Sequence, residues 1–336
     1  MEYRKTRIAH FCNVKAVLLY MVIFGHLIED AMRTQPLLEG VYRAIYMVHM
    51  PLFAFMAGMC SKDGERCAHS IGRLFACYAC IQTAAALIGR LAVGQGDLLV
   101  PWWHTWFLLS LMCWRLLALA WRALERRCRR LGSKEARLAL VLGSAALGCF
   151  AGEGEGVGRV MSLSRSIVFL PYFYLGLFLP EGTDFGRYRE YGEIALAVAL
   201  GMLYLLKDAM PVEFLYQAEG YAALGVRCGG LLRMACYVMA GLGGFALMTI
   251  VSPRRRWYTR FGISTLPVYL VHGPIVFLLR QLRLSQAWFA LLAPLAAALV
   301  YYLLYRIFCD AGSNCRLVDG AGRSMGEIVP LWMRWI

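Results

Sequence analysis

The sequence predicts an all-α protein that crosses a membrane about ten times, with both termini in the cytoplasm. Of its 336 residues, 60% are hydrophobic and only 17% are charged, whereas soluble domains usually have about 25% charged residues. One membrane-spanning helix needs about 20 apolar residues, so the apolar content suffices for about ten spans. This composition excludes soluble, disordered and fibrous proteins, and it leaves a formal net charge of +14 to be explained.

Apolar runs, separated by charged or Gly/Pro-rich breaks, define the predicted spans in chain order. The first run follows the basic residues Arg4, Lys5 and Arg7. It is longer than a signal peptide and has no obvious small-residue cleavage site, so we predict a retained helix. The fifth and seventh runs are the shortest. The ten predicted spans are about 8–28, 41–60, 74–93, 100–121, 138–151, 160–180, 192–206, 229–251, 262–279 and 287–308.

Ten spans place the loops alternately on two sides of the membrane, and the basic residues are concentrated on one of them. The side that holds both termini carries 23 Lys and Arg residues, against 8 on the other side. The positive-inside rule assigns the richer side to the cytoplasm. We therefore expect residues 1–309 to form a single transmembrane domain, located in the plasma membrane, and residues 310–336 to form a short cytoplasmic tail.

Two dense basic clusters lie on the predicted cytoplasmic side. One, between spans four and five, includes Arg126 and Arg127, and the other comprises Arg254, Arg255, Arg256 and Arg260. Such clusters orient a membrane protein and attract anionic lipid headgroups, or they bind the phosphates of an anionic cytoplasmic ligand. Membrane lipids are expected partners under the first interpretation, and no nucleic-acid partner or metal is expected.

Ionisable residues inside predicted spans are costly and indicate function. Lys15 and His26 lie eleven residues apart on the first span, which is about 16 Å along a helix. Eleven steps of 100° exceed three full turns by only about 20°, so the two side chains share a face. Glu29 follows His26 by three residues on the same face, where it can orient the imidazole and stabilise its protonated form. This pairing is typical of a general base that takes a proton from a hydroxyl.

Several further ionisable side chains reach a similar depth near the outer side of the predicted bundle. They come from six different spans and predict a shared polar cavity. An alternative is a secondary transporter with an intramembrane proton or anion pathway, although no internal repeat is visible. The six groups are His26, His49, His104, Arg165, Arg233 and His272.

These residues and their neighbours resemble a known family. Three motifs resemble the first two helices of the acyltransferase type 3 family of integral-membrane O-acyltransferases, and more closely its fucose 4-O-acetylase-like branch. They are Asn13-Val14-Lys15, Gly25-His26-Leu27-Ile28-Glu29, and His49-Met50-Pro51-Leu52-Phe53 with Gly58. Further matches extend the resemblance over positions 12 to 273. They are Arg73-Leu74, Trp106-Phe107-Leu108, Trp114-Arg115, Arg165, Leu170-Pro171-Tyr172-Phe173, Gly176, Thr265-Leu266-Pro267-Val268-Tyr269-Leu270 and His272-Gly273.

The resemblance implies a ten-helix enzyme that moves an acyl group, usually acetyl, from cytoplasmic acyl-CoA to a hydroxyl of a carbohydrate or lipid-linked sugar. The family's histidine on the first helix corresponds to His26, and the basic residue ahead of it, often Arg, corresponds to Lys15. Three positions depart from the family pattern. Cys12 stands where an Asp is frequent, Ala57 where a Ser is frequent and Cys77 where a Pro is frequent.

The expected site follows from the resemblance and the predicted topology. The phosphates of acetyl-CoA would bind Arg73, Arg126, Arg127 or the Arg254, Arg255 and Arg256 cluster, with Lys15 along the path of the pantetheine arm. His26, supported by Glu29, would activate the acceptor hydroxyl, and Arg165, His49 or His272 would stabilise the oxyanion. Direct transfer and an acyl-histidine intermediate both remain open.

Overall fold

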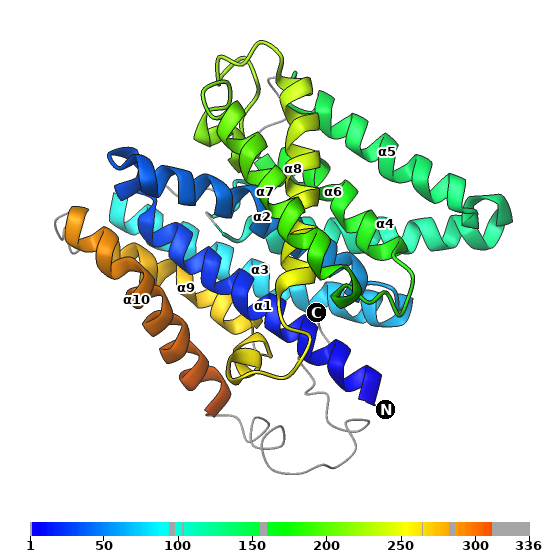
Figure 1. The fold of residues 1–336 in the computed structure, drawn as a ribbon, viewed down its shortest axis with the longest axis horizontal. Coiled ribbons are helices and arrows are strands. Elements are labelled where there is room, and N and C mark those ends of the chain that lie inside the picture. The colour runs from blue at the N-terminus through cyan, green and yellow to red at the C-terminus, as the bar shows by residue number, and fades with distance from the viewer. Residues whose placement is uncertain are drawn as a thin grey trace. The chain divides into compact units, whose positions relative to one another are not determined.

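The computed structural model describes residues 2–93, 98–102, 104–154, 160–263, 265–281 and 286–310. Over these residues the chain forms ten α-helices with short single-turn helices between them, and the described part contains no β-strand (Figure 1). The all-α class predicted from composition and periodicity is therefore confirmed. The predicted tail after residue 310 lies outside the described residues.

Each α-helix corresponds in order to one of the ten predicted apolar runs. Several begin well before the apolar run itself, because polar residues at the ends of the runs continue the helical backbone. The helices are α1 (Glu2–Ile28), α2 (Pro36–Cys60), α3 (Gly64–Val93), α4 (Trp106–Arg127), α5 (Lys134–Phe150), α6 (Leu163–Phe178), α7 (Arg189–Leu206), α8 (Gly229–Ile250), α9 (Thr265–Arg280) and α10 (Gln286–Tyr305).

Seven helical segments in the described chain are long and apolar enough to cross a membrane. They belong to α1, α2, α3, α4, α6, α8 and α10, and α9 is apolar but shorter. The two remaining helices, α5 and α7, coincide with the two shortest apolar runs of the sequence. The protein is thus a polytopic membrane protein, while ten complete spans and cytoplasmic termini stay predictions.

The described chain divides into two compact units, which we describe separately. Over the described residues, unit one lies within Met1–His49, Asp184–Leu200 and Leu242–Trp335, and unit two within Met50–Thr183 and Gly201–Gly241. In unit one, α1 contacts α9, α10 and the short helix η6 (Trp257–Gly262). In unit two, α3 packs on α4, and α6 packs on both α4 and α5. The prediction of one domain over residues 1–309 stays a prediction.

Glycine permits a close helix contact in unit two, between α2 and α6. A β-carbon at Gly58 would lie 2.0 Å from the carbonyl oxygen of Phe173, and one at Gly176 would lie 1.9 Å from that of Phe55. The two backbones therefore touch through reciprocal glycines. Small residues of this kind are what allow helices to approach closely in a membrane, where no hydrophobic effect drives them together.

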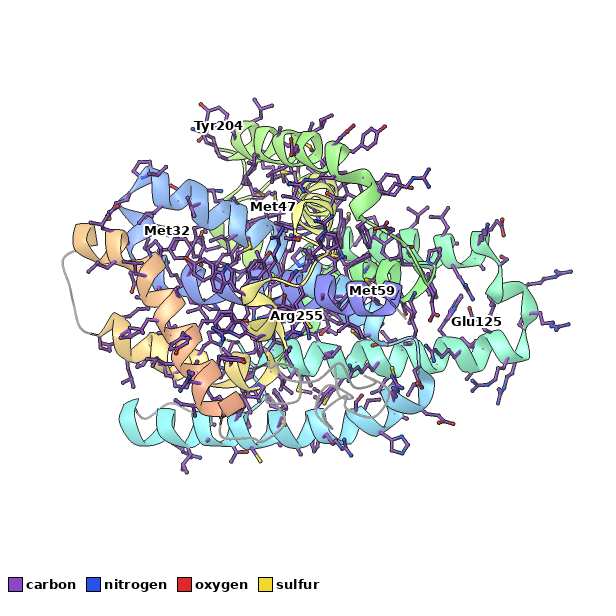
Figure 2. The ribbon with its side chains drawn as sticks, turned by 60° about the horizontal axis from the view of Figure 1, so that its bottom comes forward. Met32, Met47, Met59, Glu125, Tyr204 and Arg255 are labelled. Atoms are coloured by element: carbon purple, nitrogen blue, oxygen red, sulfur yellow. The ribbon has the colours of Figure 1, made fainter. Side chains whose placement is uncertain are left out.

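Glycine also permits a close approach in unit one, where η6 meets α1. A β-carbon at Gly262 would lie 1.7 Å from the carbonyl oxygen of Cys12. The side chain of Asn13 reinforces this contact, because its amide donates to the carbonyls of Ser252 (2.7 Å) and Arg254 (2.8 Å) and its oxygen accepts from Thr259 Oγ1 (2.6 Å). The loop that carries the 254–256 arginines is thereby attached to α1, and Figure 2 labels Arg255 in this loop.

Candidate active site

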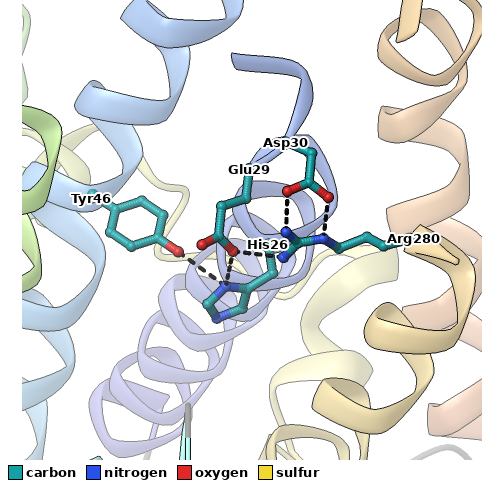
Figure 3. Close-up of polar contacts among 5 residues, drawn as sticks. All are labelled: His26, Glu29, Asp30, Tyr46 and Arg280. Atoms are coloured by element: carbon teal, nitrogen blue, oxygen red, sulfur yellow. Dashed lines mark hydrogen bonds and ion pairs between the residues drawn. The ribbon is translucent and has the colours of Figure 1, made fainter. Parts of the chain in front are cut away.

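The predicted base, His26, lies in the last turn of α1, where its ring is almost completely buried. Its Nδ1 is 3.0 Å from the hydroxyl of Tyr46, on α2, and 3.9 Å from Glu29 Oε2 (Figure 3). When Nδ1 carries the proton, the ring donates to Tyr46 and faces the carboxylate of Glu29. Nε2 is then the basic nitrogen, which is the arrangement that a general base requires.

Arg280, the last residue of α9, holds the carboxylates that follow His26 (Figure 3). Its Nη1 donates to Glu29 Oε2 at 2.8 Å, its Nε donates to Asp30 Oδ2 at 2.7 Å, and its Nη2 also bonds Asp30. A guanidinium binds carboxylates in fixed geometry through its planar fork of donors. Arg280 therefore fixes Glu29 between itself and the imidazole.

Glu29 remains ionised through the neutral and mildly acidic range. Burial raises the pKa of its carboxyl, but the imidazole of His26 and the guanidinium of Arg280 lower it by more, so the pKa lies below its ordinary value. The interactions of the carboxylate are therefore fully present above the ordinary carboxyl pKa of about 4.3 and are lost only as the pH falls through the lowered value.

We expect replacement of Glu29 by Gln to reduce the activity, because the neutral amide no longer stabilises the positive imidazolium that forms during the reaction. Asp30→Asn is a matched control, because Asp30 also bonds Arg280 but is not paired with His26. The measurement is the initial rate of both variants, and equal rates would refute the assigned role of Glu29.

Two further histidines predicted for the site, His49 and His272, lie in the same unit and are completely or almost completely buried. The His272 ring stacks on that of His26, with centroids 5.7 Å apart and an interplanar angle of 23°. His49 meets the Tyr46 ring edge-on, at 4.8 Å. The structure thus brings His26, Glu29, His49 and His272 together from α1, α2 and α9, while their catalytic roles stay predictions.

The backbone determines which nitrogen of His49 and of His272 carries the proton. His49 Nδ1 lies 2.7 Å from the carbonyl of Ile45, and His272 Nδ1 lies 2.6 Å from that of Tyr269. A carbonyl only accepts, so Nδ1 is the donor in both rings. In the neutral form their Nε2 atoms are acceptors, able to receive a hydroxyl proton but unable to donate to an oxyanion.

Tyr46 and Arg280 contact His26 and Glu29, and the sequence did not predict either contact. Tyr46 precedes His49 by three residues on one helix face, a spacing that could have indicated it. Its ring stacks on Tyr42 with centroids 4.0 Å apart, which fixes its hydroxyl toward His26. Arg280 is 251 positions from Glu29, so no local pattern could pair them.

Arg165, the remaining predicted catalytic residue, is in unit two near the start of α6. Its Nε donates to the carbonyl of Tyr216 at 2.9 Å, and its guanidinium lies 5.0 Å from the ring centroid of Trp106. Arg233 lies in the same unit, 4.0 Å from the ring of Phe214. His104 lies beside Trp102, with ring centroids 5.4 Å apart. A cavity shared by all six predicted groups stays a prediction.

Lys15 lies on α1 three helical turns before His26, and only 8% of its surface is exposed. No hydrogen bond or ion pair joins its ammonium group to any residue that the structure describes. A buried ammonium is costly unless an anion accompanies it. An Asp is frequent at position 12 in the proteins that the motifs resemble, and this chain has Cys12 there, so Lys15 lacks that carboxylate.

The other residues predicted to bind CoA phosphates are exposed and fall into two groups. Arg254, Arg255 and Arg256 belong to unit one, in the loop that Asn13 attaches to α1 two residues from Lys15. Arg73 on α3 and Arg126 and Arg127 at the end of α4 belong to unit two. Within the described ranges, no cluster of three or more His, Cys, Asp or Glu side chains could hold a metal ion.

The fold and the site together define a polytopic helical membrane protein with a buried histidine cluster. A family model described as an acyltransferase domain matches residues 12–309, nearly the whole of the helical part. The chain belongs to the acyltransferase type 3 family, which confirms the family predicted from the motifs. The comparisons with curated proteins and with solved structures returned no match. The protein is accordingly an integral-membrane acyltransferase.

Proposed function

We propose that this protein transfers an acetyl group from cytoplasmic acetyl-CoA to a hydroxyl of a carbohydrate or lipid-linked sugar, with His26 as the general base. The observation that carries the proposal is the pairing of His26 Nδ1 with Tyr46 and Glu29, which leaves Nε2 as the basic nitrogen. Family membership favours this acyl-transfer chemistry over the secondary transporter. The carbohydrate acceptor and the plasma-membrane location rest on the resemblance to the fucose 4-O-acetylase-like branch.

In the proposed reaction His26 Nε2 takes the proton of the acceptor hydroxyl as its oxygen attacks the thioester carbon. The positive imidazolium is stabilised by Glu29, which Arg280 holds in place. The tetrahedral intermediate then collapses, the carbon–sulfur bond breaks, and the CoA sulfur receives the proton from His26. The products are an O-acetyl ester and free CoA, and the neutral imidazole is regenerated.

The histidine tautomers refine the roles expected of the neighbouring residues. Neutral His49 and His272 present an acceptor nitrogen, so they suit orientation of the acceptor hydroxyl better than stabilisation of an oxyanion. Arg165 offers only donors, because a guanidinium carries five N–H groups and no acceptor. We therefore propose the two histidines as hydroxyl-orienting groups, while the oxyanion role of Arg165, which belongs to unit two, stays a prediction.

The proposal places the CoA phosphates at the 254–256 loop. Asn13 attaches that loop to α1 beside the buried Lys15, and Lys15 and His26 share a face about 16 Å apart. A pantetheine arm of comparable reach can connect phosphates bound at one end with a thioester at the other. The arginines of this loop are therefore favoured over Arg73, Arg126 and Arg127 as the phosphate-binding group.

The test of the proposed function is transfer from radiolabelled acetyl-CoA by the purified protein. We expect free CoA to accumulate slowly without an acceptor and faster with one member of a panel of sugars and lipid-linked sugars, with the label recovered as a base-labile ester. If protein that is folded and binds acetyl-CoA showed no CoA release and no label transfer across the whole panel, that result would contradict the proposal.

Replacing Lys15 by Met should raise the KM for acetyl-CoA by about tenfold to a hundredfold, since a hydrogen bond to a charged group is worth about 1.5–3 kcal/mol. The KM for the acceptor should change little. Lys15→Arg is the matched control and should retain most of the affinity, because it keeps the charge. Equal effects of both variants on both substrates would show that Lys15 only supports the helix packing.

A further inference from the structure

A cavity of about 600 Å³ lies in unit two, where α4, α5 and α6 meet the loop after α2. We call it the α4–α6 groove. Four cationic side chains and two carboxylates line it, beside a wall formed by Trp121, Leu177 and Phe178. The charged members are Lys62, Arg122, Arg126, Arg137, Glu125 and Glu181, so four positive and two negative charges leave a net charge of +2.

Two of the cations hold the walls of the groove together. Arg122 Nη2 donates to the carbonyls of Ser61, at 2.8 Å, and of Lys62, and Lys62 Nζ donates to the carbonyl of Leu179. These carbonyls follow the C-terminal ends of α2 and α6, where helix dipoles favour cations. The carbonyls are neutral, so both side chains keep their charge while lining the groove.

One of the two carboxylates that line the groove is paired with other groove residues. Glu125, labelled in Figure 2, accepts from Arg137 at 3.1 Å and from the Trp121 indole at 2.8 Å. The Arg137 guanidinium also lies 5.4 Å from the Phe178 ring centroid. This network fixes the aromatic wall, and it neutralises one cation.

Arg126 is the member of the groove with no internal role. It is exposed, and it makes no hydrogen bond or ion pair with any residue in the described part of the chain. The remaining carboxylate, Glu181, is exposed on the opposite side, after α6. The groove therefore presents Arg126, Arg122 and Lys62 as a positively charged surface that is suited to an anion.

The groove lies at the level where membrane spans end. The candidate spans Trp106–Arg127 and Val160–Phe178 both finish there, on the side that the distribution of basic residues predicts to be cytoplasmic. Leu124 and Leu175, close to these ends, are 49% and 46% exposed, as expected for side chains that face acyl chains. Anionic phospholipids are concentrated in the cytoplasmic leaflet, and their phosphates lie at this depth.

We infer that the α4–α6 groove binds the phosphate of an anionic phospholipid headgroup, whose acyl chains pack against the exposed leucines of α4 and α6. Acyl-CoA also combines phosphates with an apolar part and shares this chemistry. The donor site proposed above, however, has its own cations in unit one, at Lys15 and the 254–256 loop. The inference does not depend on the acyl-transfer chemistry of His26.

The test is the thermal unfolding of the purified full-length protein in detergent, titrated with short-chain phosphatidylglycerol, with phosphatidylcholine of the same chains, or with CoA. We expect phosphatidylglycerol to raise the unfolding temperature at lower concentrations than phosphatidylcholine. Arg126→Ala should raise the phosphatidylglycerol concentration needed for this response about fivefold. One basic residue at an anionic surface contributes about 1 kcal/mol, which corresponds to that factor. The matched control is Arg129→Ala, an exposed arginine of the same basic cluster outside the groove.

Three outcomes would overturn the inference. An equal loss in Arg126→Ala and Arg129→Ala would show diffuse attraction by the whole basic cluster. Competition between CoA and phosphatidylglycerol, with both weakened by Arg126→Ala, would make the groove a donor site. Equal responses to phosphatidylglycerol and phosphatidylcholine in all forms of the protein would show that the groove does not recognise the anionic headgroup.

Discussion

Replacing His26 by Ala should lower the acetyl-transfer rate by about 100- to 10,000-fold, the usual contribution of a general base. The expected loss follows from geometry. Tyr46 and Glu29 occupy the Nδ1 side of the ring, and Arg280 holds Glu29, so this imidazole joins a basic nitrogen to a partly buried, fixed carboxylate. The measurement is the initial rate of ester formation from labelled acetyl-CoA at saturating acceptor.

The control for this loss is His69→Ala. His69 is exposed on α3, and its ring bonds only the preceding turn, at the carbonyl of Glu65. We expect His69→Ala to retain the wild-type rate, and both variants to match the wild type in expression and in unfolding temperature. Near-normal transfer by a folded His26→Ala protein would refute the mechanism, and His272, whose ring stacks on His26, would then be the next candidate base.

Replacing Gly176 by Ala should destabilise the protein by about 3 kcal/mol, the upper part of the range for overpacking a close contact. The new β-carbon would lie 1.9 Å from the carbonyl oxygen of Phe55, so α2 and α6 would have to separate. A backbone atom cannot move aside as the end of a flexible side chain can. The measurement is the unfolding temperature of the purified variant in detergent.

Gly143→Ala on α5 is the matched control, because nothing lies within 4 Å of a β-carbon at that position. Alanine is the better helix former, so this variant should be as stable as the wild type or slightly more stable. An unfolding temperature for Gly176→Ala equal to that of Gly143→Ala would show that the α2–α6 contact is looser than the structure indicates.

The pairs that the sequence predicted are those held on a single helix. His26 with Glu29, and Lys15 with His26, follow from the 3.6-residue helical period alone. The structure places the His26 ring beside the Glu29 carboxylate and leaves Lys15 buried without an anion in the described chain. Gly58 and Gly176 were visible as motif positions, but their reciprocal contact with the facing backbones becomes evident only once α2 and α6 are packed.

By itself the sequence determined the class of the protein, the order of its helices and the family to which it belongs. Composition, apolar periodicity and short motifs are local properties, so they can be read without knowing how the helices pack. Only the tertiary structure decided that Arg280 holds Glu29, that His272 stacks on His26 and that Asn13 attaches the 254–256 loop to α1. Each of these contacts joins residues more than 230 positions apart, and only the packing of distant helices brings them together.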